Sequence, residues 1–406
     1  MSAAETQMAA LASDTAKKRG PLASVRVVDL SRLVAGNMLT HVLADLGADV
    51  IKIENPDRGD DLRRWRVKDV EVFWKIYARN KRSVTLNLRS DSGRAALEAL
   101  IASAQALVEN FTPGTLEAMG LSPERLLQIN PKLVIVRVSG WGQTGPYKNR
   151  PGFGTLVEAM SGFADLNGFP DAPPCLPPIA TADMIAGLYG AMAMLSALRV
   201  VEVGNGGGQV IDVSLFEPIF SLISTEALQF HLTGVPTQRA GNQSTHTAPR
   251  NLYECADGHY VALSGSIQSM AERLFRTMGK PELIDDPRFK SNDERVQNRD
   301  ALDRIIAEFI MQRSRDENLE LFEKAGVTVG PVCSVSELTT HPYVLGREAL
   351  IQVDDPQFGK IPMHNVVPRL SATPGGIHHS APQLGEHTEE VLAELAASTQ
   401  RTQENV

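Results

Sequence analysis

An aspartate stands at the start of the most apolar stretch of the chain. Asp183 precedes fifteen uncharged residues, 184–198, whose pattern predicts one buried helix. The free N–H groups and the dipole of a helix N-terminus are expected to keep such a carboxylate ionised. An ionised, partly desolvated carboxylate can act as a nucleophile, although an aspartate in this position is more often only an N-cap.

A second group of candidates combines cations, amides and an aromatic ring near the ends of predicted strands. Residues 80–83 read Asn-Lys-Arg-Ser, Arg89 follows the same predicted strand, and residues 109–114 read Glu-Asn-Phe-Thr-Pro-Gly. Together they could bind a phosphorylated nucleotide. Taken singly, each has an ordinary explanation, because surface cations are usually solvated and Asn-Phe before Pro-Gly is common turn chemistry.

Several standard catalytic motifs are absent. The chain contains no P-loop pattern, and GNGGG at 204–208 does not match GxGxxG. Its nine histidines form no HExxH or other ligand spacing, so no metal is expected. Around Ser139, Arg137 and Trp141 occupy the two positions that a nucleophile elbow requires to be glycine. These observations argue against a P-loop enzyme, a zinc enzyme and a serine hydrolase.

Charge and cysteine content narrow the setting. The 406 residues carry a formal net charge of −8, which provides no global positive field for nucleic acid or an anionic membrane. The three cysteines are widely spaced and odd in number, so we expect no disulfide framework and a reducing, cytoplasmic setting. Residues 1–20 lack a continuous apolar region, and we expect a loose leader there.

The elements that must position these residues alternate between strands and helices. Short β-branched runs separated by helical patterns predict an α/β fold with a mostly parallel, doubly wound sheet. Ligands bind such sheets at the carboxyl ends of the strands. We therefore expect the site in the loops that follow Leu30, Glu54, Leu88, Asn110 and Gly140.

The middle of the chain has a different character. A hairpin is predicted to turn at Asp257-Gly258, and helices are predicted near 268–279, 298–312 and 316–325. We expect a large domain at 21–222, a small domain with its linkers at 223–335, and a return to the large domain at 336–406.

In combination, these segments resemble the family III CoA-transferases (CaiB/BaiF), the group that contains formyl-CoA transferase, carnitine CoA-transferase and the 2-methylacyl-CoA racemases. The resemblance runs from Pro21 to the LGEHTEEVL run at 384–392. Its other markers are Val27-Val28-Asp29-Leu30, Ala35-Gly36, LGADVIKIE at 46–54, Asn80-Lys81-Arg82-Ser83, ENFTPG at 109–114, WGQTGP at 141–146, Ala182-Asp183, Asp212-Val213-Ser214-Leu215 and Gly330-Pro331-Val332.

The resemblance implies a Rossmann-like large domain, a smaller α+β domain and an interlocked-ring homodimer. It implies that Asp183 attacks an acyl-CoA thioester and forms an aspartyl anhydride, then an aspartyl-CoA thioester. The substrates would be an acyl-CoA and a small carboxylic acid. Coenzyme A would enter as part of a substrate, and no tightly bound cofactor or metal is implied.

The resemblance also assigns the expected CoA contacts. It places Val34, Ala35 and Asn55 in the first crevice, Leu86, Asn87, Leu88 and Arg89 beside the adenosine, and Asn110, Phe111 and Met119 near pyrophosphate and pantetheine. Arg89 is the expected phosphate partner. Formyl and oxalyl chemistry are not expected, because Val34 replaces an acyl-pocket glutamine and Ala118 a phosphate-side arginine. Gly154 and Glu158 likewise replace the common Asp and Gln of their loop.

Two alternatives remain open at this point. A two-base racemase needs a histidine in the loop at 151–154, but no histidine lies between His41 and His231. A non-catalytic CoA-binding protein would bind CoA without a covalent adduct. For the transferase, Arg150, His246 and Arg250 could contact a second carboxylate, which favours a dicarboxylate acid as substrate.

Overall fold

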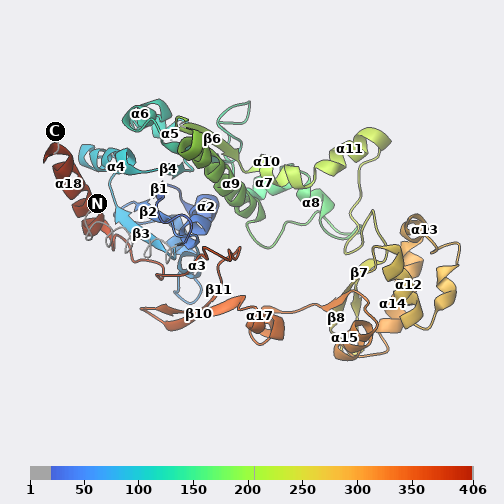
Figure 1. The fold of residues 1–406 in the computed structure, drawn as a ribbon. Coiled ribbons are helices and arrows are strands. Elements are labelled where there is room, and N and C mark those ends of the chain that lie inside the picture. The colour runs from blue at the N-terminus through green and yellow to red at the C-terminus, as the bar shows by residue number, and fades with distance from the viewer. Residues whose placement is uncertain (1–19, 205, 405–406) are drawn as a thin grey trace. The chain divides into compact units, whose positions relative to one another are not determined.

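The computed structural model describes residues 20–204 and 206–404. In this part the chain forms two compact units (Figure 1). The larger unit contains the chain up to Phe163, Pro177–Ala227 and the chain from Arg347 onward, and the smaller unit contains Ala164–Leu176 and Leu228–Gly346. The leader expected at 1–20 lies, except for Gly20, outside the described residues.

Six strands form one parallel sheet in the larger unit. They are β1 (Arg26–Asp29), β2 (Asp49–Glu54), β3 (Lys81–Thr85), β4 (Ala106–Glu109), β5 (Val134–Ser139) and β6 (Gln209–Ser214). Their order is β3-β2-β1-β4-β5-β6 and every pairing is parallel, which is the order of a Rossmann-type sheet. The predicted α/β fold is confirmed, but the third strand starts at Lys81 instead of Ser83.

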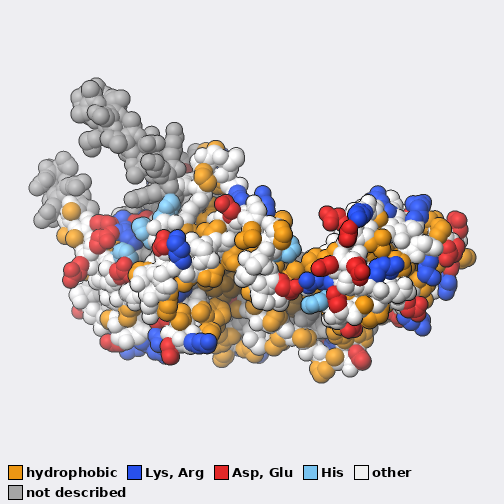
Figure 2. All heavy atoms as spheres, turned by 90° about the horizontal axis from the view of Figure 1, so that it is seen from below, with side chains coloured by type: hydrophobic (Ala, Val, Ile, Leu, Met, Phe, Trp, Pro, Cys, Tyr) orange, Lys and Arg blue, Asp and Glu red, His pale blue; other side chains and the backbone are white. Residues whose placement is uncertain are grey.

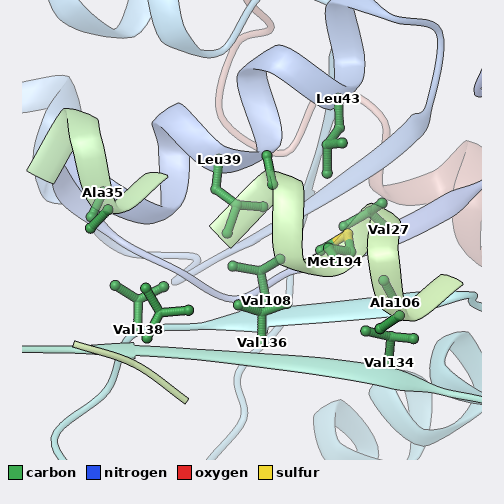
Figure 3. Packing of buried hydrophobic residues seen from close by; sticks show 14 of the residues in the cluster. Val27, Ala35, Leu39, Leu43, Ala106, Val108, Val134, Val136, Val138 and Met194 are labelled. Atoms are coloured by element: carbon green, nitrogen blue, oxygen red, sulfur yellow. The ribbon is translucent and has the colours of Figure 1, made fainter. Parts of the chain in front are cut away.

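Helices cover both faces of this sheet. The helices of the larger unit are α2 (Leu33–Asp45), α3 (Val72–Tyr77), α4 (Asp91–Ser103), α5 (Thr115–Ala118), α6 (Pro123–Ile129), α7 (Gly154–Met160), α9 (Thr181–Gly204), α10 (Phe216–Leu222) and α18 (Thr388–Glu404), with the 3-10 helix η1 (Asp61–Arg64). Successive strand residues point to opposite faces. Val27 therefore packs with α2 and α9, as Figure 3 shows for its neighbours Leu39 and Met194, whereas Val28 packs with α4 and α18.

Helix α9 is only half enclosed, which corrects the prediction of a buried helix. The helix is 24 residues long and, by length and composition alone, apolar enough to cross a membrane. Only 39% of its most apolar 18-residue stretch is buried. One face packs into the core, while Leu188, Met192 and Val203 on the other face are exposed. The apolar stretch thus exceeds what this chain alone covers. Hydrophobic side chains also remain visible on the molecular surface in Figure 2.

The C-terminal return completes the larger unit with the antiparallel hairpin β10 (Leu350–Asp355) and β11 (Gly359–His364). Lys75 Nζ donates to the Asp355 carboxylate at 2.7 Å, and Trp74 Nε1 donates to the Pro382 carbonyl at 2.9 Å. These buried contacts connect the hairpin and the tail to α3.

The smaller unit contains the predicted hairpin and helices. Its elements are β7 (Arg250–Glu254), β8 (Tyr260–Ser264), α12 (Gln268–Thr277), η2 (Pro281–Ile284), α13 (Asn292–Gln297), α14 (Arg299–Ile310), α15 (Arg315–Lys324), β9 (Val329–Pro331), α16 (Val335–Leu338) and α17 (Pro342–Gly346), while α8 (Phe163–Leu166) and α11 (Ser224–Thr233) cross its boundaries. The segment 164–176 belongs here because Arg239 donates to the Asp165 carboxylate and the Phe169 carbonyl. The expected range 223–335 does not include that segment.

Candidate active site

Two cavities lie in the larger unit at the carboxyl ends of its parallel strands. Sheet growth changes direction between β1 and β4, and such a switch point leaves a crevice beyond the strand ends. The first cavity has a volume of about 240 Å³ and the second about 480 Å³. All five loops expected from the sequence, those after Leu30, Glu54, Leu88, Asn110 and Gly140, contribute residues to these walls.

The first cavity contains most of the residues expected to contact CoA. Its walls include Asn55, Leu86, Asn87, Leu88, Arg89, Phe111 and Met119. Arg58 also lines it, and neither Arg58 nor Arg89 has a carboxylate within ion-pair distance in the described part of the chain. A cavity with an apolar floor and two unpaired guanidinium groups suits a ligand with an apolar or aromatic part and phosphates.

The second cavity contains Asp183. Ala35, Asn110 and Arg150 line it as well, together with Arg32 and Lys148. The Arg150 guanidinium lies over the Tyr147 ring at 3.7 Å from the ring centroid. Three cations and two carboxylates, Asp61 and Asp183, therefore line this cavity, and Arg32 Nη1 lies 3.9 Å from Asp61 Oδ2. Lys148 and Arg150 leave positive charge that suits an anionic ligand next to Asp183.

Arg32 and Phe111 line both cavities and form their common border. The loops that carry them are fastened by a reciprocal pair, because the Arg32 N–H donates to Asn110 Oδ1 at 2.8 Å and Asn110 Nδ2 donates to the Arg32 carbonyl at 2.7 Å. The Asn110 side chain is thus engaged with the loop after β1, and it shapes the border between the two cavities.

A buried ionic network stabilises the loop after β1. Lys52 lies 3.3 Å from Asp29 Oδ1 and 3.1 Å from Asp60 Oδ2, and Lys81 lies 3.4 Å from Asp29 Oδ2. Asp60 Oδ1 accepts the N–H of Leu33 at 3.0 Å. This bond holds Leu33 at φ 59°, a left-handed conformation that a non-glycine residue adopts only under constraint.

Asp183 is the third residue of α9 and therefore not its N-cap. Burial raises the pKa of Asp183, and the Glu158 carboxylate raises it further, to about 6, against a smaller lowering by the backbone. Desolvation and a like charge therefore outweigh the opposing contribution of the backbone. Above pH 6 the group is still mostly ionised.

The loop between β5 and α7 closes over this end of the sheet. Gly140 and Gly152 touch so closely that a Cβ on Gly140 would lie 2.5 Å from the Gly152 Cα. Trp141 Nε1 donates to the Pro151 carbonyl at 3.0 Å. Ser139 lines the second cavity, and its buried Oγ has no hydrogen-bond partner among the described residues. A ligand atom could supply that partner.

Two sets of residues named in the sequence analysis lie away from the two cavities. Val34 lines neither cavity and packs against Leu62 and Trp74, because successive helix residues point in different directions and its neighbour Ala35 faces the second cavity. The run 80–83 lies at the amino end of β3, the opposite edge of the sheet from the cavities. There Lys81 is buried in the ionic network and Arg82 pairs with Asp49.

His246 and Arg250 belong to the smaller unit. The His246 carbonyl accepts from Asn292 Nδ2 at 2.9 Å, and Arg250 Nη1 donates to the Gln243 carbonyl at 3.3 Å. Their role as substrate contacts remains a prediction.

Several residues of the cavity walls are not among those predicted from the sequence. These are Arg32, Arg58, Ser139 and Lys148. Arg32 and Ser139 sit where strands β1 and β5 end, so the rule that sites gather at carboxyl ends would have included them. Arg58 and Lys148 lie in loops with no signal of their own.

One group of side chains in the described part of the chain has the spacing of metal ligands. His41, Asp45 and His364 bring one ligand atom each within 4.8 Å of one another. However, Arg79 donates to both Asp45 oxygens, at 3.1 and 2.6 Å, and to the His364 carbonyl at 2.7 Å. The guanidinium already neutralises the carboxylate, and the cluster connects α2 to β11.

The geometry is that of an α/β protein with two neighbouring cavities at the carboxyl ends of its parallel strands, lined by several arginine and lysine side chains, with Asp183 in the wall of the second. Comparison with known proteins agrees with this. The family model of CoA-transferase family III, which describes the family's sequences, matches residues 22–388 of this chain. A succinyl-CoA:D-citramalate CoA-transferase of Chloroflexus aurantiacus is 39% identical, over 94% of this chain and 95% of that protein.

Two further proteins are similar over most of the chain. The alpha subunit of a succinyl-CoA:L-malate CoA-transferase of Chloroflexus aurantiacus is 38% identical over 94% of this chain and 90% of that protein. The crystal structure of a CaiB/BaiF family protein from Brucella suis superposes with a TM-score of 0.81 at 35% identity, over 93% of this chain and 100% of that one.

The chain therefore belongs to CoA-transferase family III and is a CoA-transferase. The family resemblance predicted from the sequence motifs is confirmed. The alternative of a non-catalytic CoA-binding protein is wrong.

Proposed function

We propose that this enzyme transfers CoA from a dicarboxylic acyl-CoA, such as succinyl-CoA, to a free dicarboxylic acid of four to six carbons. The observation that carries the proposal is the wall that Asp183 shares with Arg32, Lys148 and Arg150. A dicarboxylic substrate keeps one carboxylate away from the reacting carbon, and these cations can bind it. The names of the two Chloroflexus relatives agree with such substrates.

Covalent catalysis by Asp183 accounts for the exchange without any other reagent. An Asp183 oxygen attacks the thioester carbonyl, the C–S bond breaks, and CoA leaves as thiolate while an acyl-aspartyl anhydride forms. The thiolate then attacks the Asp183 carbonyl, which releases the first acid as a carboxylate and leaves an aspartyl-CoA thioester. The second acid enters by the same two steps in reverse and leaves as acyl-CoA, so Asp183 regains its charge.

The two cavities supply a place for each end of the acyl-CoA in this proposal. The nucleotide would occupy the first cavity, with Arg58 and Arg89 near its phosphates. The pantetheine arm would cross the border at Phe111, and the thioester would reach Asp183 in the second. The unpartnered Ser139 Oγ could donate to a substrate oxygen there.

A homodimer, interlocked as in the family, belongs to the same proposal. The exposed apolar side chains of α9 and α10 support it, because Met192, Val203 and Leu222 are each more than half exposed in the single chain. Apolar faces of this kind are usually covered by a partner.

The test is a matrix of acyl-CoA donors and free acids, read by mass spectrometry of the CoA esters. We expect exchange among C4 to C6 dicarboxylates. Arg150→Ala should lower kcat/KM for a dicarboxylate about tenfold, and for a monocarboxylate much less. Arg125→Ala, on the surface helix α6, is the matched control. Exchange of monocarboxylates alone would show that the dicarboxylate proposal is wrong.

The racemase alternative predicts a different result. No histidine lines the second cavity in the described residues, so the two-base mechanism lacks its second base. When a 2-methylacyl-CoA is incubated with the enzyme in deuterated water, we therefore expect no deuterium at its α-carbon. Deuterium incorporated there in the absence of acyl exchange would support the racemase.

A further inference from the structure

Helix α7 presents two residues to the first turn of α9. Gly154 and Glu158 are four positions apart and so lie on one face of α7. A Cβ on Gly154 would stand 2.1 Å from Asp183 Oδ2 and 3.3 Å from its Cγ. The Asp183 carboxylate can therefore take its present place only because residue 154 has no side chain.

Glu158 makes the second contact. Its Oε1 accepts the N–H of Ala182 at 3.0 Å, and both residues are buried. This N–H belongs to the first turn of α9, where backbone donors lack helical partners. The Glu158 carboxylate thus caps the helix one residue before Asp183, and in the described part of the chain no lysine, arginine or histidine forms an ion pair with it.

The other charged groups on the surrounding elements have different partners. On the neighbouring strands, Arg137 of β5 pairs with Glu109 and Glu117, and Asp212 of β6 accepts from the Gln143 N–H. On the neighbouring helices, Glu217 of α10 accepts from Ser214, and Asp45 of α2 pairs with Arg79 beside His41. The remaining charged side chains near Asp183 line the second cavity: Arg32, Asp61, Lys148 and Arg150. Among charged side chains, only Glu158 contributes to the raised pKa of Asp183, after burial itself.

We propose that Gly154 and Glu158 are positioning residues for Asp183: the glycine leaves room for the reacting carboxylate, and the glutamate fixes the first turn of α9 and opposes the Asp183 charge with its own. This inference rests on the proposed function, in which Asp183 is the nucleophile.

The paired carboxylates favour the covalent states of the reaction. Free Asp183 is repelled by Glu158, whereas an anhydride or a thioester at Asp183 is neutral and is not repelled. The repulsion therefore shifts the equilibrium from free carboxylate towards acylated enzyme, by the same factor by which it favours protonation of Asp183. A shift of one unit in the pKa of Asp183 therefore corresponds to a tenfold change in the amount of covalent adduct at equilibrium.

Glu158→Gln tests the charge while it retains an oxygen that can accept the Ala182 N–H. The acid limb of kcat/KM should move down by about one pH unit, and the covalent adduct at equilibrium should fall about tenfold. Glu202→Gln is the matched control, since it removes an exposed carboxylate at the far end of the same helix; it should change neither quantity.

Gly154→Ala tests the room beside Asp183. The change should favour helix α7, because alanine is the better helix former, but it should displace the Asp183 carboxylate and reduce adduct formation at least about a hundredfold. Gly204→Ala is the control, since a Cβ there meets no atom within 4 Å. Thermal unfolding of each variant shows whether it is folded. If Glu158→Gln does not fold, the adduct level of Gly154→Ala is the test of the proposed positioning roles.

The outcomes separate this inference from the proposed function. An unchanged acid limb and adduct level in folded Glu158→Gln, or full adduct in Gly154→Ala, would contradict the positioning roles while Asp183→Asn remains inactive. An active Asp183→Asn would instead contradict the proposed function itself.

Discussion

Asp29 and Asp183 are two aspartates of the same unit in opposite surroundings. Asp29 ends β1, is completely buried, and lies within 3.4 Å of both Lys52 and Lys81. Asp183 lines a cavity and has a second carboxylate, Glu158, as its charged neighbour. Burial alone would raise both pKa values. The two lysines, with hydrogen bonds from Ser31 and Thr40, lower the pKa of Asp29 overall, whereas Glu158 adds to the rise at Asp183.

The difference shows what each charge does for the protein. The Asp29 charge is compensated and stabilises the loop after β1. The Asp183 charge is uncompensated, so it costs stability and remains available for reaction.

Asp183→Asn should lower the rate of CoA exchange by at least about a thousandfold, because the amide cannot form the anhydride. The measurement is the initial rate with an acyl-CoA and an isotopically labelled acid, under conditions where circular dichroism shows the native fold. A variant that keeps a tenth of the activity would contradict the role of Asp183.

Asp29→Asn should lower the free energy of unfolding by about 3 kcal/mol, since it leaves Lys52 and Lys81 buried without their common counter-ion. Denaturant unfolding followed by circular dichroism measures this. Asp171→Asn, at an exposed position, is the control and should change stability by less than about 0.5 kcal/mol. Equal stabilities of the two variants would mean that the network contributes little.

Asp183→Asn should have the opposite effect on stability. The folded-state pKa of about 6 lies above the ordinary value of 3.8, so the folded state binds the proton more tightly and stability falls as pH rises from about 4 to 6. Removal of the charge should therefore stabilise the protein by up to about 3 kcal/mol at pH 7. The gain should vanish below pH 4; a gain that is equal at pH 4 and pH 7 would have another cause.

Arg89→Ala should have the smallest effect, a rise in KM for the acyl-CoA of about fivefold with kcat nearly unchanged. Arg89 lines the first cavity far from Asp183 in sequence, and it would contact a phosphate that is present in substrate and transition state alike. Arg125→Ala should leave KM unchanged. A fall in kcat without a change in KM would place Arg89 closer to the chemistry than proposed.

The sheet and the location of the cavities could be predicted from the sequence because both follow from local patterns. β-branched runs such as 134–139 specify buried parallel strands, and the carboxyl-end rule then locates the loops. The motif resemblance added Asp183, which lines the second cavity.

The pairing of charges could not be predicted in this way. Lys81 looked like a ligand-binding cation, but its partner Asp29 is 52 residues away and only the sheet register brings them together. Glu158 and Ala182 are 24 residues apart and meet through the packing of two helices. The partial exposure of α9 could not be predicted either, because the hydrophobicity of its sequence does not specify which of its faces the rest of the chain covers.

The most direct test of the central claim is to identify the covalently modified residue. The enzyme would be incubated with succinyl-CoA, treated with hydroxylamine, digested and mapped by mass spectrometry. We predict a hydroxamate at Asp183 that depends on succinyl-CoA and is absent from Asp183→Asn. A hydroxamate at another carboxylate, or continued turnover with no modified aspartate, would contradict the account.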